Sequence, residues 1–196
     1  MHKDYTGAKM GMWLFLFSEL LLFGGLFILY AVSLNRHGAA FAAAGQELDW
    51  MLGTLNTLVL LTSSLTAALA VSAIQQGKAQ MALRCLWATI GFALGFLVVK
   101  YVEWGTKIHH GLYPGGAELA GREAGQMSFF NLYYVTTGLH GLHVIIGGLV
   151  LGWVIIKVRQ GKVHGGDFVL LENSVLYWHL VDLIWIFIFP LYYLVL

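Results

Sequence analysis

The stretch Met10–Leu34, MGMWLFLFSELLLFGGLFILYAVSL, is long enough to cross a bilayer as a helix and carries one acid, Glu19. A helix rises about 1.5 Å per residue, so Glu19, nine positions after Met10, lies about 13 Å inside a hydrocarbon core about 30 Å thick. No base stands one helical turn away from it on either side. An ionisable side chain at that depth is costly and marks a candidate functional site. The alternative is a protonated carboxyl group that hydrogen-bonds a neighbouring helix and fixes packing.

Composition places the whole chain in a membrane. Of its 196 residues, 59% are hydrophobic and 11% are charged, whereas soluble domains carry about 25% charged residues. The formal net charge of +1 gives no reason to expect nucleic-acid binding. The single cysteine, Cys85, cannot form an internal disulfide. The first apolar run is too long for the h-region of a cleaved signal peptide.

Four further apolar runs predict an all-α fold, an integral membrane bundle of five transmembrane helices that forms a single domain over residues 1–196. The predicted helices are about 10–34, 50–74, 82–105, 128–156 and 171–194. Strands of a membrane barrel would be shorter and would alternate apolar with polar residues. With the N-terminus in the cytoplasm, the inner segments carry seven Lys or Arg residues and the outer loops three. The positive-inside rule therefore predicts a cytoplasmic N-terminus and a C-terminus outside, on the periplasmic side.

Two of the spans carry small or hydroxyl residues at spacings typical of helix contacts. Residues 50–74 contain one Asn and several Ser and Thr residues, which predicts close packing with interhelical hydrogen bonds rather than a substrate path. Gly91 and Gly95, in the third span, have the small-xxx-small spacing of a packing seam.

The third span ends in KYVEWGTK, where Lys100 and Lys107 can both reach Glu103 on the helix surface. This segment lies near the predicted outer surface, so we expect a solvated ion pair of little energetic weight. The loop that follows holds His109 and His110, which are adjacent and do not share a helix face. No further clear ligands surround them, so no metal site is predicted there.

Three histidines fall within the predicted spans. His140 and His143 are three residues apart on one face and could ligate a haem or a metal. A haem bundle would need matching histidines opposite, and His179 is the only other well-buried candidate, so packing and interhelical hydrogen bonds are favoured. His179 and Asp182 also share a face. Because His179 lies at a depth close to that of Glu19, we expect these two to face each other, directly or through lipid or water.

No Ser-His-acid arrangement, Cys-x-x-Cys pair or Walker loop occurs in the sequence, so no catalytic residue is predicted. The inner loop KVRQGKVHGG, residues 157–166, is basic and could contact anionic lipid headgroups.

Four stretches, in order, resemble subunit III of the haem–copper oxidases. They are FSELLLFGGLFILYA (17–31), LNTLVLLTSSLT (55–66), FFNLYYVTTGLHGLHVIIGG (129–148) and YWHLVDLIWIFIFPLYY (177–193). The last two are very specific, and the similarity covers almost the whole chain. The chain resembles the bacterial five-helix form, which lacks the first two of the seven helices of mitochondrial-type members. In longer members that pair forms one wall of a lipid cleft, so the lipid sites of the cleft are not carried over.

The resemblance implies an accessory subunit of a terminal oxidase, cytochrome c-linked, that reduces oxygen to water and pumps protons in a bacterial inner membrane. It implies that this chain holds no haem or copper, which belong to partner subunits. It also implies that the chain packs on the catalytic subunit I, binds structural phospholipid, and supports proton uptake and active-site stability. Glu19 matches the family's carbodiimide-reactive glutamate. The other matching motif residues are Glu103, His140, His143, His179 and Asp182.

Subunit III of a quinol oxidase and the subunit III-like protein of nitric oxide reductase are alternatives with the same fold, because the electron donor docks on other subunits. Two other classes are an independent transporter that uses Glu19 as a proton carrier, and a di-haem electron carrier built on His140, His143 and His179. The internal repeat and broken helices typical of transporters are not found in the sequence.

Overall fold

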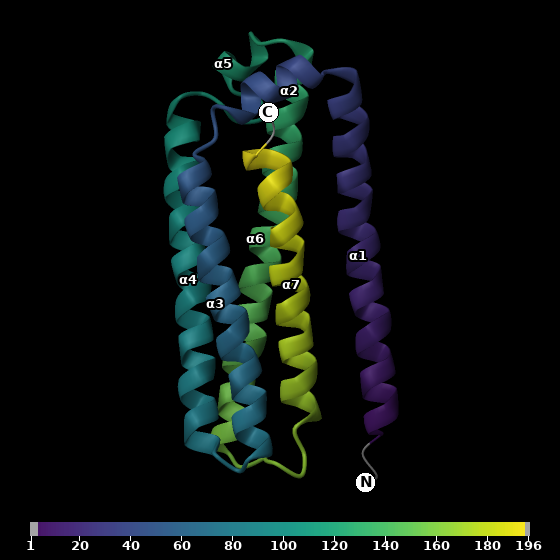
Figure 1. Cartoon of the computed structure of the whole chain (residues 1–196), viewed down its shortest axis with the longest axis vertical. Helices are drawn as coiled ribbons and strands as arrows, with labels where there is room; N and C mark the ends of the chain where they lie inside the picture. The colour runs from purple at the N-terminus through teal and green to yellow at the C-terminus, as the bar shows by residue number, and fades with distance from the viewer. Residues whose placement is uncertain (1–3, 195–196) are drawn as a thin grey trace.

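The computed structural model describes residues 4–194 and confirms an all-α membrane bundle. Five helices are long and apolar enough to cross a membrane: α1 (Tyr5–Arg36), α3 (Trp50–Gln75), α4 (Ala79–His109), α6 (Ala124–Arg159) and α7 (Val169–Tyr193). Two short helices, α2 (Gly38–Gly45) and α5 (Ala117–Ala120), lie together at one end of the bundle (Figure 1). Within residues 4–194 the only β-type pairing is an isolated bridge between His164 and Asp167.

Local signals account for where the helices begin and turn. The carboxylate of Asp49 accepts hydrogen bonds from the backbone N–H groups of Met51 and Leu52 at 2.9 and 3.2 Å, which caps the start of α3. Gly77 and Gly161, with φ of 75° and 68°, form the turns that follow α3 and α6. The predicted spans are present but several extend further, and α2 was not predicted.

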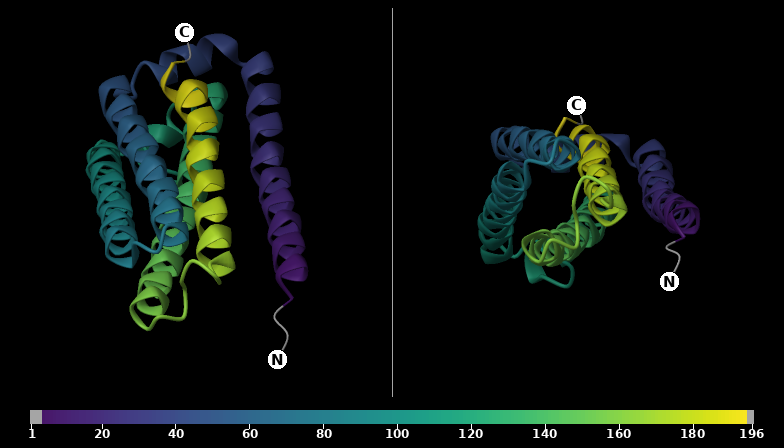
Figure 2. Two further views of the ribbon diagram at one scale, coloured as in Figure 1. Left: turned by 60° about the horizontal axis from the view of Figure 1, so that its bottom comes forward. Right: turned by 90° about the horizontal axis from the view of Figure 1, so that it is seen from below.

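Helix α1 packs on the side of the bundle formed by α6 and α7, away from α4 (Figure 2). Its buried residues are Leu16, Phe23 and Tyr30, which repeat every seven positions and therefore form one narrow stripe along the helix. The Tyr30 hydroxyl donates a hydrogen bond to the Leu191 carbonyl oxygen near the end of α7, where helical carbonyls lack partners of their own. Most of α1 outside this stripe remains exposed apolar surface.

Hydrogen bonds from α3 to α7 confirm the predicted role of the small hydroxyl residues. The indole Nε1 of Trp185 donates to Thr57 Oγ1 at 3.0 Å, and that of Trp178 donates to Ser63 Oγ at 2.7 Å. Both tryptophans are fully buried. Their N–H groups would be unpaired without these hydroxyls, so the polar residues of α3 fix how α7 packs against it.

The packing seam predicted at Gly91 and Gly95 is wrong within this chain. In the described part of the chain, no atom of another helix lies within 4 Å of the position that a Cβ would take at either glycine. Close helix approach occurs instead at Gly53, where a Cβ would stand 2.8 Å from the Phe189 ring, and at Gly147, where it would stand 2.8 Å from a tryptophan of α7. The spacing of the glycines defines a helix face, but it does not determine which face meets a neighbour.

Candidate functional site

Glu19 has a basic partner within the membrane-spanning region, and that partner is His143 of α6. The Oε2 atom of Glu19 lies 3.0 Å from the Nε2 atom of His143. The side chain of Glu19 is 14% exposed and that of His143 is 11% exposed. Glu19 follows Leu16 by three positions and precedes Phe23 by four, which places it on the stripe of α1 that faces the bundle. The expected pairing with His179 is therefore wrong: α1 packs on both α6 and α7, but His179 faces α3, where its Nδ1 lies 2.6 Å from a serine hydroxyl.

The hydrogen bonds of His143 determine how many protons the pair holds. Its Nδ1 lies 2.8 Å from the Leu139 carbonyl oxygen, which can only accept, so Nδ1 carries a proton. One further proton is then shared between His143 Nε2 and Glu19 Oε2. Either a neutral carboxyl group donates to a neutral imidazole, or an imidazolium donates to a carboxylate. Both arrangements have no net charge, which is how an acid can be accommodated at this depth.

His179 and Asp182 both face α3. His179 Nδ1 lies 2.6 Å from Ser64 Oγ. The carboxyl group of Asp182, which is 3% exposed, lies beside the same serine, and neither of its oxygens has a hydrogen-bond partner among residues 4–194. The predicted shared face is confirmed, and it belongs to the contact between α3 and α7.

His140 is enclosed in the core between α4 and α7. It has no exposed surface and its ring lies 5.4 Å from that of Phe96 and 5.2 Å from that of Trp185. His140 packs against α4 and α7, which fits the packing interpretation. The interhelical hydrogen bond expected of it is wrong, because neither of its ring nitrogens has a partner among residues 4–194. Within the part of the chain that the structure describes, no cluster of three or more His, Cys, Asp or Glu residues could hold a metal ion.

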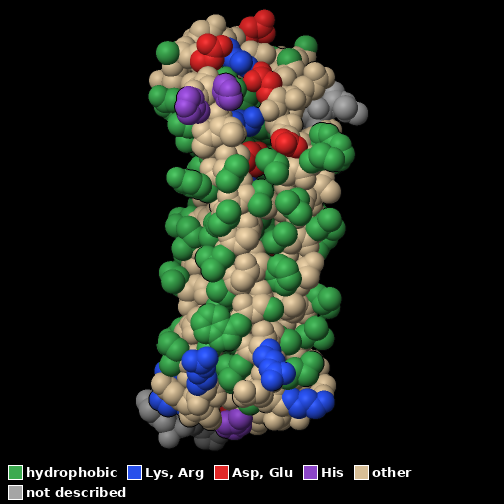
Figure 3. Space-filling view, turned by 90° about the vertical axis from the view of Figure 1, so that its left-hand side faces the viewer, with side chains coloured by type: hydrophobic (Ala, Val, Ile, Leu, Met, Phe, Trp, Pro, Cys, Tyr) green, Lys and Arg blue, Asp and Glu red, His purple; other side chains and the backbone are tan. Residues whose placement is uncertain are grey.

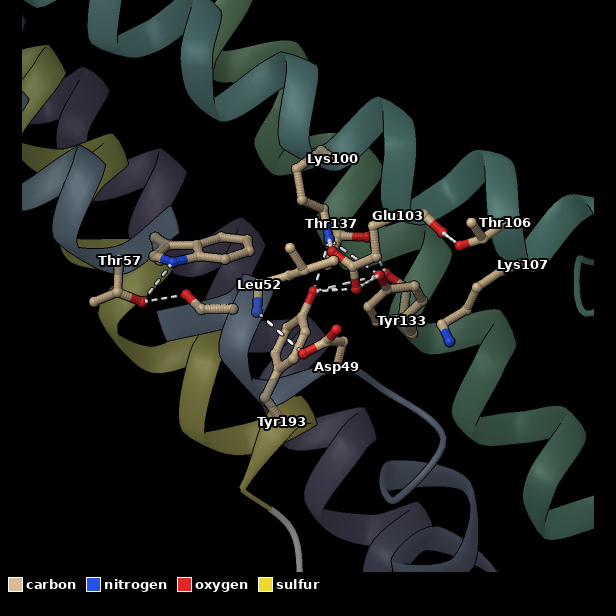
Figure 4. A network of polar contacts seen from close by, with 12 residues as sticks. Asp49, Leu52, Thr57, Lys100, Glu103, Thr106, Lys107, Tyr133, Thr137 and Tyr193 are labelled. Atoms are coloured by element: carbon tan, nitrogen blue, oxygen red, sulfur yellow. Dashed lines mark hydrogen bonds and ion pairs between the residues drawn. The ribbon is translucent and has the colours of Figure 1, made fainter. Parts of the chain in front are cut away.

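A buried polar network lies where α4, α6 and α7 meet (Figure 4). Lys100 Nζ donates to Glu103 Oε2 at 3.0 Å and to the hydroxyls of Tyr133 and Tyr193 at 3.0 and 2.8 Å. The two hydroxyls also lie 2.7 and 2.6 Å from Glu103 Oε1. The Lys100 and Glu103 side chains are 9% and 2% exposed. The expected solvated ion pair is therefore wrong, because the two tyrosines cover it.

Lys107 does not join this network. Its Nζ donates to the Glu47 carbonyl oxygen at 2.6 Å, and the Glu47 carboxylate pairs with Arg122. These contacts tie the segment between α2 and α3 to the ends of α4 and α6. The three residues line an open cavity of about 630 Å³ at the α2 and α5 end. Acidic and histidine side chains gather at this end on the surface shown in Figure 3.

Tyr133 and Tyr193 are site residues that the sequence interpretation missed. Each carries a hydroxyl within a long apolar helix, and a hydroxyl buried there needs a polar partner. Lys100 and Glu103, the base and the acid near the end of another span, are the partners from which the role of the two tyrosines could have been predicted.

The bundle and its paired polar residues define a polytopic membrane protein whose intramembrane acids and bases contact residues of neighbouring helices. The family model for cytochrome c oxidase subunit III matches residues 2–195, and the chain belongs to this family. The earlier resemblance is thereby confirmed.

Named relatives agree with this assignment. The chain is 33% identical over 193 residues to the heme-copper oxidase subunit I+III of Aeropyrum pernix, covering 95% of this chain but 22% of that longer protein. It is 33% identical over 194 residues to cytochrome c oxidase subunit 3 of Thermostichus vulcanus, covering 98% and 89% of the two chains. It is 31% identical over 194 residues to the corresponding subunit of Alkalihalophilus pseudofirmus, covering 94% and 85%.

Proposed function

We propose that this chain is the accessory subunit of a cytochrome c-linked terminal oxidase in a bacterial inner membrane and packs on the catalytic subunit I. The observation that carries the proposal is the family match over residues 2–195. The relative from Aeropyrum pernix, named as a subunit I+III, supports a contact with subunit I. Haem and copper belong to the partner subunits, and this chain contributes no redox centre.

The end of the bundle at which α1 begins is proposed to face the cytoplasm. Six Lys or Arg residues of the connections and helix ends lie there among residues 4–194, at positions 9, 78, 84, 157, 159 and 162. The opposite end carries α2 and α5. Positive residues are retained on the cytoplasmic side of a membrane, which supports this orientation.

The pair of Glu19 and His143 is proposed to support proton uptake by the neighbouring catalytic subunit. It can change the position of its one proton between oxygen and nitrogen without creating an unpaired charge. The pair also attaches α1 to the bundle. The network of Lys100 and Glu103, together with His140, His179 and Asp182, holds the other four spans in one arrangement and performs no chemistry.

The relatives reported above are named as cytochrome c oxidase or heme-copper oxidase subunits, and these names do not favour a quinol oxidase or a nitric oxide reductase partner. The carboxyl group of Glu19 is paired with His143 of the same chain. This pairing does not favour Glu19 as the proton carrier of an independent transporter.

The role is tested by preparing the oxidase with and without this chain. We expect similar initial rates of oxygen reduction in both preparations and a faster loss of activity during turnover in the preparation that lacks the chain. Addition of the purified chain should restore the lifetime. An equal lifetime in both preparations, or loss of the initial rate itself, would contradict a supporting role. Coupled solute transport by the chain alone in liposomes would also contradict it.

A further inference from the structure

Bases without acidic partners gather where α4 begins and α6 ends. Arg84 lies in the second turn of α4, and Lys157 and Arg159 lie in the last turn of α6. None of the three forms an ion pair with a carboxylate among residues 4–194. Figure 3 shows Lys and Arg side chains gathered at the lower end of this face, far from the acidic side chains at its upper end.

Two tryptophans hold these bases against the side of the bundle. Lys157 Nζ lies 5.0 Å from the centroid of the Trp153 ring, and Arg159 Cζ lies 5.9 Å from that of Trp87. The two indoles are 48% and 51% exposed. Such contacts keep the cations beside the rings rather than extended into solvent. Exposed indoles at a helix end are typical of the membrane–water interface, so the bases lie at headgroup level.

Arg84 belongs to the same surface, because it precedes Trp87 by three positions on α4 and therefore shares its helix face. We call this surface the basic–indole patch. It consists of Arg84, Trp87, Trp153, Lys157 and Arg159.

The surface next to the patch, toward the middle of the bundle, has room for hydrocarbon. Among residues 4–194, no atom beyond the adjacent residues and backbone of the same helix lies within 4 Å of the Cβ positions of Gly148 and Gly152 on α6, or of Gly91 on α4. Leu149 and Ile156, on α6, expose 71% and 52% of their surface. An occupant that matches both regions has a negatively charged headgroup and an apolar chain.

We propose that the basic–indole patch binds the phosphate headgroup of an anionic phospholipid, whose acyl chains lie along α4 and α6. The patch supplies three uncompensated positive charges, and juxtamembrane Lys and Arg residues attract anionic lipid headgroups. Helix α4, which carries Arg84 and Trp87, lies on the side of the bundle away from α1 (Figure 2). The inference goes beyond the proposed function and rests on its membrane placement, but not on the identity of the partner subunit.

Native mass spectrometry of the full chain in detergent tests the site. The probes are phosphatidylglycerol and phosphatidylcholine with identical acyl chains. We expect the unaltered chain to retain phosphatidylglycerol preferentially. Removing one base should weaken its retention about fivefold, and the double variant Arg84→Gln/Arg159→Gln about 25-fold, from the typical contribution of a base near an anionic surface.

Two controls make the result specific. Lys78→Gln/Lys162→Gln removes the same charge from exposed positions at the same end of the bundle and should change retention less than twofold. Arg84→Lys/Arg159→Lys keeps the charge and should retain most of the binding, which shows that the altered surface still folds. Inorganic phosphate at the lipid concentration should not displace the lipid, because it lacks acyl chains.

Equal retention of the two lipids by the unaltered chain would overturn the proposal. An equal loss in the Lys78/Lys162 control would also overturn it, and displacement by inorganic phosphate would overturn the assignment to a lipid. Because the assay uses the chain alone, its failure leaves assembly with subunit I untouched, and co-purification reports on assembly independently.

Discussion

Replacing Lys100 by Met should destabilise the bundle strongly, because it leaves the Glu103 carboxyl group buried without its base. The Glu103 side chain is 2% exposed, so water cannot replace the lost ammonium group. Breaking a buried ion pair by removing one partner costs about 3–5 kcal/mol. The hydroxyls of Tyr133 and Tyr193 remain within 2.7 Å of the carboxyl group and offset part of this cost, which favours the lower end of the range.

The double variant Lys100→Met/Glu103→Gln should recover much of this loss. It removes both charges while keeping an amide that can bond the two tyrosine hydroxyls, and replacement of a whole buried pair is often nearly neutral. With the single variant Glu103→Gln the cycle is complete, and it measures the coupling expected between Lys100 and Glu103, which contact each other directly.

The assay is the free energy of unfolding of the purified chain in mixed micelles, followed by tryptophan fluorescence. Lys78→Met is the matched control, since the Lys78 side chain is exposed and its ammonium group bonds only the Gln76 side chain among residues 4–194. We expect this variant to change the free energy of unfolding by at most about 0.5 kcal/mol. The reasoning is refuted if Lys100→Met costs no more than the control. It is refuted equally if the double variant is as unstable as the single one.

Three other substitutions test separate contacts. Glu19→Gln should change the free energy of unfolding by less than about 1 kcal/mol, because the amide can still donate to His143, and carbodiimide labelling of the chain should disappear. Tyr30→Phe should cost about 1–3 kcal/mol, because it leaves the Leu191 carbonyl oxygen without its donor. Gly53→Ala should cost about 1–3 kcal/mol, because the new methyl group would meet two aromatic rings of α7 at 2.8 Å.

Matched changes show whether these effects have the stated causes. Glu19→Leu should cost more than Glu19→Gln, since it leaves an imidazole nitrogen unpaired, and persistent labelling of Glu19→Gln would show that another carboxyl group reacts. Gly91→Ala, at a position with open space, should be neutral or stabilise the helix by up to about 1 kcal/mol. If it costs as much as Gly53→Ala, close packing is not the cause. A Tyr30→Phe variant as stable as the unaltered chain would show that its hydrogen bond contributes nothing.

The length and apolar composition of the runs were sufficient to predict the five spans, because a hydrocarbon core requires long apolar helices with satisfied backbones. Two details at the α2 and α5 end of the bundle were not predicted. The turn sequence Gly38–Gly45 is rich in alanine and forms α2, and α4 continues to His109. The segment Gly38–Gly45 is apolar but has only eight residues, too few to cross a membrane, and the end of α4 is polar.

The partners of the polar residues were not predictable from spacing. Glu19 and His179 lie at similar depths in neighbouring helices, but depth does not tell which face of a helix meets which neighbour, and His179 faces α3. The position of α1 beside α6 brings His143 to Glu19 instead. The burial of Lys100 likewise depends on Tyr133 of α6 and Tyr193 of α7. These tyrosines lie 33 and 93 residues after Lys100 in the chain. Side chains that share a face of one helix could be predicted from their spacing, whereas contacts between residues of different helices could not.

The most direct test of the subunit assignment is purification of the tagged full chain from its native membrane in mild detergent. We predict that a haem–copper subunit I co-purifies in equal amount, with the reduced-minus-oxidised haem spectrum of a cytochrome c oxidase, and that this spectrum stays with subunit I when the two chains are separated. A haem spectrum that remains with the isolated chain, or purification of the chain without any haem–copper subunit, would contradict the assignment.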